Sequence, residues 1–211
     1  NVLVGCDASG IELRMLAHYM GDPEHTKQIL EGDIHSYNQE KIGLPSRSMA
    51  KTWVYGTLYG AGDAKLGSII GGSAKQGKQS RVAFETNVPS YGKLVKKMKA
   101  AASAGKVQSL VGGWIRIRHD HAALNTLLQG AGATVMKVAL LEAYKSMKEA
   151  GIPFKIVANV HDEWQVETPK HFGKAVGMHL RQGIINAGVV LKLNCPLDGE
   201  FNIGQNWAET H

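Results

Sequence analysis

Residues 156–166 read IVANVHDEWQV, and this stretch decides how the fold is interpreted. Strand-forming apolar residues lead up to Val160, a His-Asp-Glu cluster interrupts them, and the strand pattern then resumes through Val166. The pattern predicts two strands joined by a tight turn. Such turns more often contain Asn-Gly or Asp-Gly, because two adjacent carboxylates repel each other and are costly to bury. The pair formed by Asp162 and Glu163 therefore needs a reason beyond turn formation.

A further carboxylate ends another apolar strand. Residues 1–7 read NVLVGCD, which predicts a short buried strand ending at Asp7, followed by a helix over residues 11–20. If the two strands are neighbours in one sheet, Asp7 and Asp162 converge at its edge. Carboxylates held that close are unfavourable unless a divalent cation offsets them, and Mg²⁺ prefers oxygen ligands. The alternative interpretation is a solvated turn at Asp162 and Glu163, with Asp7 as a helix cap.

Composition bounds the function only loosely. The chain has 211 residues, with 44% hydrophobic and 20% charged residues, which is typical of one large globular domain or two small lobes. The formal net charge of +6 favours an anionic partner such as nucleic acid or nucleotides, although a basic protein without such a partner has the same charge.

We identify no signal peptide and no apolar run of about 20 residues, so we expect a cytoplasmic protein without a membrane segment. Cys6 and Cys195 lack metal-type spacing and are expected to be reduced core thiols rather than a disulfide.

The remaining pattern predicts a small sheet with helices on one side and a largely helical insertion between about residues 33 and 130. The motif Gly21-Asp22-Pro23 ends the first helix. Further helices are expected over 33–41 with Asp33 as cap, over 47–62, within the lysine-rich stretch 64–105, over 121–151 and over 169–187. Residues 112–120 alternate like a strand, and residues 189–211 predict one or two strands and a tail. The expected fold class is α+β with two lobes.

The helix expected over residues 47–62 carries a distinctive stripe. Arg47, Lys51, Tyr55 and Tyr59 recur every four residues and therefore share one helix face. Two cations followed by two aromatic residues suit a phosphate chain and a base or sugar. The alternative is a solvated basic stripe whose two tyrosines belong to the core. His35 precedes this helix and is either another phosphate donor or a structural histidine.

Five ordered segments then resemble a known family. They are DASGIELRMLAH (7–18), GDIHSYNQ (32–39), RSMAKTWVYGTLYGAG (47–62), HAALNTLLQGAGA (121–133) and VHDEWQV (160–166). In this order they resemble family A (Pol I-like) DNA polymerases, most closely the replicative enzymes of short-tailed bacteriophages. The resemblance covers nearly the whole chain and is weakest over about 71–117. It implies a right-hand polymerase fold with palm at 1–32 and 131–211 and fingers at 33–130.

The resemblance also implies an activity, which is template-directed DNA synthesis in phage-type replication. Asp7, Asp162 and the carbonyl of Ala8 would hold two Mg²⁺ ions, one activating the primer 3′-hydroxyl and the other binding the triphosphate. Glu163 would act as a secondary acid beside them. Glu12 would crowd the sugar 2′ position and favour deoxynucleotides.

The same resemblance assigns the other site residues. Residues implied in binding the incoming dNTP are Arg47, Lys51, His35 and Tyr55, with Lys51 as the candidate to protonate pyrophosphate. A tyrosine at position 55 implies tolerance of dideoxynucleotides. Residues implied in contacting the template or primer are Tyr59 and Gly60 at the templating base, and Arg14, Gln129 and His161 near the primer–template, the last two at the minor groove.

The chain also departs from the family pattern. The N-terminal 3′–5′ exonuclease domain, the thumb and the first part of the palm do not fit within it, so we expect weak grip on duplex DNA and no thumb-bound processivity partner. Gly113 and Trp114 stand where a basic pair is expected, which puts a primer–template contact in doubt, although Arg116 and Arg118 are candidates to replace it. Two alternative functions remain: a nucleotide- or DNA-binding polymerase fragment with negligible activity on its own, and a two-metal nuclease, which would not need the stripe at 47–59.

Overall fold

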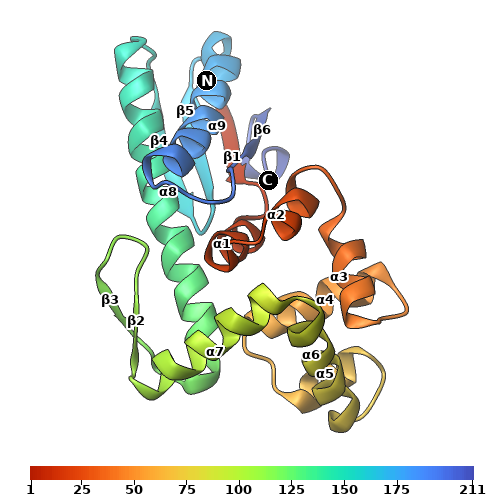
Figure 1. Cartoon of the computed structure of the whole chain (residues 1–211). Coiled ribbons are helices and arrows are strands. Elements are labelled where there is room, and N and C mark those ends of the chain that lie inside the picture. The colour runs from red at the N-terminus through yellow and green to blue at the C-terminus, as the bar shows by residue number, and fades with distance from the viewer. The chain divides into compact units, whose positions relative to one another are not determined.

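The strand–turn–strand predicted at residues 156–166 is present (Figure 1). Strands β4 (Lys155–Val160) and β5 (Glu163–Thr168) pair antiparallel across a two-residue turn. Strand β5 also pairs antiparallel with β1 (Val2–Ala8), and β1 with β6 (Gly199–Gly204), which gives the sheet order β4-β5-β1-β6. The strand that ends near Asp7 is therefore the direct neighbour of the strand that follows Asp162, which is the condition on which the convergence of Asp7 and Asp162 depends.

The computed structural model describes all residues from 1 to 211, and these form two units. Unit 1 contains residues 1–15 and 131–211, and unit 2 contains residues 16–130. The boundary falls within helix α1 (Ile11–Met20) and within helix α8 (Ala123–Glu149). The expected α+β class is confirmed, because one unit is built on a small antiparallel sheet and the other is largely helical.

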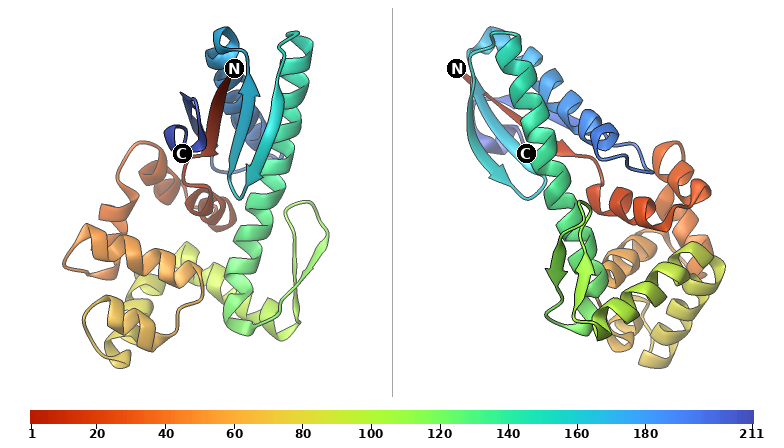
Figure 2. Two further views of the ribbon diagram at one scale, coloured as in Figure 1. Left: turned by 180° about the vertical axis from the view of Figure 1, so that it is seen from behind. Right: turned by 60° about the vertical axis from the view of Figure 1, so that its left-hand side comes forward.

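Unit 1 has its core on one face of the sheet, which helix α9 (Gly173–Val190) covers (Figures 1 and 2). Strand side chains alternate between faces, so Val4 and Cys6 of β1 point the same way as Trp164 and Val166 of β5. All four are essentially fully buried. Both cysteines, Cys6 included, are buried and free, as expected.

The opposite face of the sheet is covered by the C-terminal residues. A short 3₁₀ turn, η3 (Trp207–Glu209), packs against β6 and leads to Thr210, which is buried. The expectation of one or two strands after residue 188 holds only for β6, because Val189 and Val190 extend α9 instead. Both side chains are exposed at the end of this helix.

Unit 2 contains six further α-helices and a two-stranded ribbon. They are α2 (Pro23–Leu30), α3 (Ile34–Ile42), α4 (Arg47–Leu58), α5 (Asp63–Ile69), α6 (Ala74–Asn87), α7 (Pro89–Ser103) and the ribbon of β2 (Lys106–Gln108) and β3 (Trp114–Arg116). The predicted cap of α3 is confirmed, since the Asp33 carboxylate accepts from the backbone N–H groups of His35 and Ser36. Helix α2 was not predicted; Asp22 caps it and Pro23 occupies its first turn.

The core of unit 2 is an aromatic cluster shared by three helices. Trp53 of α4 meets Phe84 of α6 edge to face at 5.5 Å between ring centroids, and Phe84 meets Tyr91 of α7 at 4.7 Å. The indole N–H of Trp53 donates to the Ser80 hydroxyl at 2.9 Å, so its polar atom is satisfied inside the core. These contacts fix α4, which carries the predicted stripe.

Helix α8 is the long helix expected near residues 121–151. By length and composition alone, residues 120–149 pass as a candidate membrane span, which the sequence analysis did not identify. The core helix of a soluble protein passes the same test, and 33% of the apolar window is buried within the structure. Composition therefore does not assign α8 to a membrane.

His25 on α2 gives the fold a pH dependence. Its side chain has 0% exposure, neither ring nitrogen has a hydrogen-bond partner, and burial lowers its pKa from 6.5 to about 4, with Asp22 opposing that shift. The folded state therefore keeps this ring neutral while the unfolded chain takes up a proton below pH 6.5. Stability contributed by the neutral ring is present above pH 6.5 and is lost as the pH falls toward 4.

We predict that His25→Phe reduces the acid sensitivity of the fold. Between pH 7.5 and pH 4.5 the variant should lose about 2–3 kcal/mol less unfolding free energy than the parent, as measured by urea denaturation. The exposed His171, replaced by Asn, provides the control for loss of a histidine from the surface. Parallel profiles for the parent and His25→Phe would contradict the prediction.

Candidate active site

The paired strands of unit 1 bring two aspartates to one edge of the sheet. Asp7 lies opposite Glu163 in the β1–β5 register, and Asp162 occupies the turn immediately before β5. The backbone N–H of Ala8 donates to the carbonyl oxygen of Asp162 at 3.0 Å, which ties the turn to the end of β1. The expected convergence of Asp7 and Asp162 is thus built into the backbone.

Electrostatics at this edge disfavour a charged Asp7. Partial burial raises the pKa of its carboxyl, and the neighbouring carboxylates of Glu200, Asp162 and Glu163 raise it further. Glu200 lies opposite Asp7 in the β1–β6 register, and sequence analysis missed it because only the sheet pairing brings it there. No group of three or more His, Cys, Asp or Glu side chains is arranged as ligands of one ion. The oxygen-rich, mutually repelling set around Asp7 and Asp162 nevertheless suits a hard divalent cation.

Glu163 differs from its neighbour, because its carboxylate is turned into the structure. Its exposure is 7%, and it accepts hydrogen bonds from the indole N–H of Trp207 at 2.9 Å and from the side-chain amide of Gln165. The Nδ1 atom of His211 lies 2.6 Å from its second oxygen. Burial raises the pKa of Glu163, but these hydrogen bonds outweigh it and the net shift is downward.

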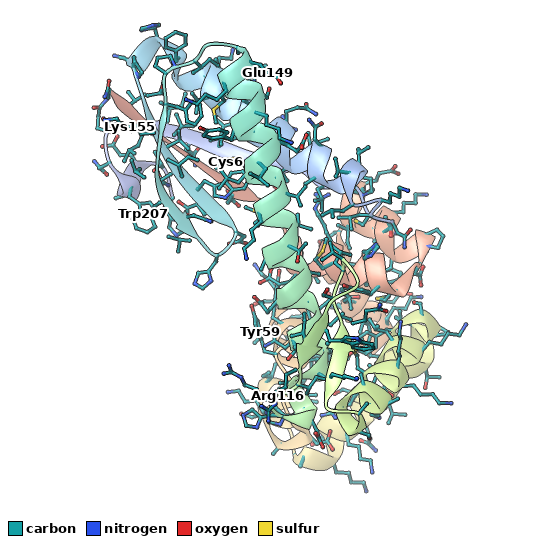
Figure 3. All side chains as sticks on the ribbon, turned by 90° about the vertical axis from the view of Figure 1, so that its left-hand side faces the viewer. Cys6, Tyr59, Arg116, Glu149, Lys155 and Trp207 are labelled. Atoms are coloured by element: carbon teal, nitrogen blue, oxygen red, sulfur yellow. The ribbon has the colours of Figure 1, made fainter.

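The same network anchors the last residues of the chain. The Thr210 hydroxyl donates to the Gln165 amide oxygen at 2.8 Å, and both side chains are buried. Gly5 makes room for this packing, since a Cβ at that position would collide with the backbone carbonyl of Thr210. Figure 3 labels Trp207, whose indole N–H donates to Glu163 from the same segment. Glu163 is therefore the point at which the C-terminal segment attaches to the candidate site.

The other predicted residues of unit 1 are His161, Arg14 and Glu12. His161 is exposed at the first turn position with φ 54°, a left-handed conformation that is uncommon for residues other than glycine. Arg14 of α1 donates from Nε to the carbonyl of Ser9 at 2.7 Å and from Nη1 to the carbonyl of Pro196 at 2.5 Å. Glu12 is half-buried in the first turn of the same helix.

In unit 2 the first three residues of the predicted stripe, Arg47, Lys51 and Tyr55, lie on α4, and His35 lies beside Tyr55. The helix ends at Leu58 rather than at residue 62, so Tyr59 follows it. The Arg47 Nε lies 2.6 Å from the Asp33 carboxylate, and this guanidinium holds the Asp33 pKa well below its usual range. The rings of His35 and Tyr55 lie 6.2 Å apart. Burial lowers the His35 pKa, and the positive charges of Arg47 and Lys51 lower it further. The structure thus brings together four residues of the predicted nucleotide site.

The remaining predicted residues of unit 2 lie on α4, directly after it, and on α8. Lys51 is exposed, and Tyr59 caps the C-terminal end of α4. Gly60 has φ 83°, and a Cβ there would collide with the backbone carbonyl oxygen of His121. Gln129 is exposed on α8. Unit 1 thus holds the predicted acids together with Glu12, and unit 2 holds the other predicted nucleotide residues, His35, Arg47, Lys51 and Tyr55.

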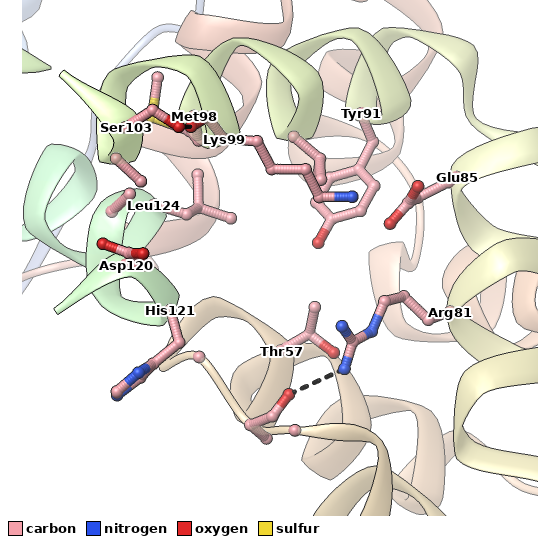
Figure 4. A pocket seen from close by; sticks show the side chains of 16 residues that line it. Thr57, Arg81, Glu85, Tyr91, Met98, Lys99, Ser103, Asp120, His121 and Leu124 are labelled. Atoms are coloured by element: carbon pink, nitrogen blue, oxygen red, sulfur yellow. Dashed lines mark hydrogen bonds between the residues drawn. The ribbon is translucent and has the colours of Figure 1, made fainter. Parts of the chain in front are cut away.

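Gly60 also borders a pocket of about 400 Å³ within unit 2 (Figure 4). Figure 4 shows the Tyr91 hydroxyl and the Arg81 guanidinium facing the same cavity, and Arg81 donates to the backbone carbonyl of Ala61 at 3.2 Å. Lys99 and Asp120 add charges of opposite sign to its lining. This pocket contains none of the acids of unit 1, so we do not assign the chemistry of Asp7 and Asp162 to it.

Comparison with known proteins matches one family over almost the whole chain. The family model described as DNA polymerase family A covers residues 1–209. The DNA-directed DNA polymerase of Escherichia phage Phieco32 is 37% identical over 100% of this chain and 40% of its own length. That of Escherichia phage T7 is 36% identical over 100% of this chain and 33% of its own length. The chain therefore spans two fifths or less of the length of these relatives.

A solved structure supports the same fold. The chain resembles the POL domain of Pol1 from M. smegmatis, which is in complex with DNA primer-template and dNTP, with a TM-score of 0.85. The match covers 98% of this chain and 40% of the other, at 23% sequence identity. At that identity the likeness establishes the fold alone.

We predict that Glu163 and Asp162 contribute differently to stability. Glu163→Ala should lower the unfolding free energy by about 2–3 kcal/mol, because the buried Gln165 amide and the Trp207 indole lose their acceptor. Asp162→Ala should leave stability unchanged or higher, since it removes a carboxylate that opposes ionisation of Asp7. Chemical denaturation at pH 7 measures both.

The matched variant Trp207→Phe keeps the aromatic packing and removes only the indole donor. It should show part of the Glu163→Ala loss, about 1 kcal/mol. Equal stability losses in Glu163→Ala and Asp162→Ala would show that the hydrogen bonds to Glu163 do not anchor the segment.

Proposed function

Because the chain belongs to DNA polymerase family A, we propose that it carries out template-directed DNA synthesis in phage-type replication, transferring a nucleotide from dNTP to a primer 3′-hydroxyl. The observation that carries this proposal is the 3.0 Å hydrogen bond from Ala8 to Asp162, which fixes the turn of Asp162 beside the end of β1 and Asp7. A turn held in this way positions two carboxylates more rigidly than a loose loop.

Asp7, Asp162 and the Ala8 carbonyl are the residues that would hold two Mg²⁺ ions. The repulsion among Asp7, Asp162 and Glu200 supports this assignment, because a bound cation offsets it. When bound, Mg²⁺ supplies activation of the 3′-hydroxyl and stabilisation of the leaving pyrophosphate. Glu163 supports the site by fixing the first residue of β5 and is not needed as a ligand in this proposal.

The residues on and beside α4 would bind the incoming dNTP. Arg47, Lys51 and His35 supply donors or positive charge for the triphosphate, and Tyr55 would line the sugar and base pocket. The low pKa of His35 keeps its ring neutral at pH 7, so it would act as a hydrogen-bond donor rather than a cation. Lys51 is exposed, and its ammonium group would protonate the pyrophosphate.

Primer–template DNA would be the second substrate. Tyr59 and Gly60 would face the templating base, and Arg14, Gln129 and His161 would contact the duplex. Since the relatives are two to three times longer, we also propose that the chain works with the remaining N-terminal portion of such a polymerase. A fragment that binds nucleotide and DNA with negligible activity on its own is the alternative function, favoured by the same difference in length.

We predict Mg²⁺-dependent extension of a labelled primer on a template in the presence of dNTPs. Asp162→Ala should reduce extension at least 100-fold, because it removes a proposed ligand, while leaving dNTP binding measurable by filter assay. Lys78→Ala, an exposed lysine of α6, is the matched surface control and should extend primers normally.

Three outcomes distinguish the alternatives. Extension that depends on Asp162 supports a self-sufficient active site. No extension with retained dNTP binding supports the binding fragment. Degradation of DNA without added nucleotides would instead reveal a nuclease and overturn the proposal.

Glu12 should control sugar selection. If its half-buried side chain crowds the 2′ position, Glu12→Ala should raise the ratio of ribonucleotide to deoxynucleotide incorporation at least tenfold, as measured by single-nucleotide kinetics. Glu24→Ala on α2, an exposed acid, serves as control. An unchanged ratio would remove Glu12 from the proposed sugar contact.

A further inference from the structure

The pocket of about 400 Å³ in unit 2 has no part in the proposed chemistry (Figure 4). Its lining residues come from the end of α4, from α6 and α7 and from the start of α8, and all of them belong to unit 2. Small-molecule sites usually have volumes of about 300–1,000 Å³. One water occupies about 30 Å³ in the liquid, so a single water does not fill this pocket.

Tyr91 of α7 supplies the observation that points to a ligand. Its side chain is 2% exposed, and its ring packs against Phe84 in the core of unit 2. Its hydroxyl nevertheless faces the pocket, and no hydrogen bond joins it to another lining residue (Figure 4). Burial raises the pKa of this hydroxyl, and the carboxylate of Glu85 raises it further, so the hydroxyl remains a donor at neutral pH. Because buried tyrosine hydroxyls are normally paired, a bound group with an acceptor atom would satisfy it.

The pocket is apolar on one side and polar on the other. Figure 4 shows Met98 and Leu124 on one side, with Arg81 and Glu85 across from them. Both Met98 and Leu124 are buried, so the apolar side is continuous with the core rather than with solvent. A lining of this kind, with an apolar wall and a few polar groups, suits a molecule with an apolar body and one polar group.

The charges of the lining are balanced. Arg81 and Lys99 are positive, and Glu85 and Asp120 are negative. Arg81 is in addition paired with the carboxylate of Asp63, which lies outside the lining, at 2.7 Å. A ligand with a net charge would meet a like charge in the pocket and would lose its own hydration there. The lining therefore favours a neutral molecule.

We propose that this pocket binds a small, uncharged aromatic molecule that carries a carbonyl oxygen, with its ring against Met98 and Leu124 and its carbonyl accepting from the Tyr91 hydroxyl. The lining also includes Thr57 and Gly60 at the end of α4, so a bound molecule would link that end to α7. An effect of the ligand on nucleotide addition rests on the proposed function, whereas the binding itself does not.

The test is the binding of 4-fluorobenzamide to the purified chain, without DNA or nucleotides, measured by titration with fluorine NMR. Two probes of nearly the same shape define the class of ligand, because 4-fluorobenzoate is an anion and 4-fluorobenzylamine is a cation. The amide should bind at least about fivefold more tightly than either charged probe. Tighter binding of either charged probe would overturn the proposal of a neutral ligand.

Tyr91→Phe removes the proposed donor and keeps the ring. It should weaken the binding of 4-fluorobenzamide about 3- to 10-fold, the value of one neutral hydrogen bond. The stability of the chain without the probe should be unchanged or higher, because the lost hydroxyl bonds to no other lining residue. A hydroxyl that served only the fold would instead lower stability when removed. Tyr144→Phe on α8, at a tyrosine outside the pocket, is the matched control and should bind as the parent does.

Ala102→Phe places a ring inside the pocket and should abolish binding. Unchanged affinity in Tyr91→Phe, or in Ala102→Phe with an intact fold by circular dichroism, would overturn the proposal. Displacement of the probe by the oligonucleotide dT₁₂ would also overturn it, because the pocket would then belong to a nucleic-acid path. Asp162→Ala should bind the probe normally even though it extends no primer, so failure of the proposed function leaves this test intact.

Discussion

The pairing of β1 with β5 is the constraint on which the candidate site depends. This pairing holds Asp7 and Asp162 at one edge of the sheet although their carboxylates repel each other. Two unit charges 4 Å apart in water repel by about 1 kcal/mol. The apolar side chains of the same two strands offset that cost, since each fully buried Val or Trp contributes about 1.5–3 kcal/mol. Because Val4, Cys6, Trp164 and Val166 alternate with the polar positions, one pairing register both fills the core and presents the acids.

Two adjacent carboxylates in this turn have different environments. Asp162 remains half-exposed, whereas Glu163 lies in the strand and is enclosed by donors from Gln165, Trp207 and His211. Surroundings rather than residue type thus decide which acid is available for chemistry and which supports the structure. This difference explains why both acids occur side by side. Asp162, the proposed metal ligand, needs a fixed turn, and Glu163 secures the strand that begins there.

The sequence predicted the parts of this structure that depend on local pattern. The hairpin at residues 156–166, the Asp33 cap and the alignment of Arg47, Lys51 and Tyr55 on α4 all follow from spacing and propensity, and the structure has them. It did not predict features that depend on long-range pairing. Glu200 joins the acids only through β6, and the attachment of Thr210 to Gln165 joins residues 45 positions apart. Helix α2 was missed for another reason, since Asp22 and Pro23 end one helix and begin the next.

Strand β4 has a consequence for the solubility of the protein. It forms one edge of the sheet, and Ile156, Val157 and Val160 are all exposed along it. A flat edge of that composition would invite strands of other molecules to add to the sheet and aggregate. The register shift between Ile156 and Ala158 leaves Val157 unpaired and breaks the regular row of donors and acceptors. The irregularity in β4 therefore acts as protection against intermolecular β-sheet growth while the Asp162 turn next to it stays in place.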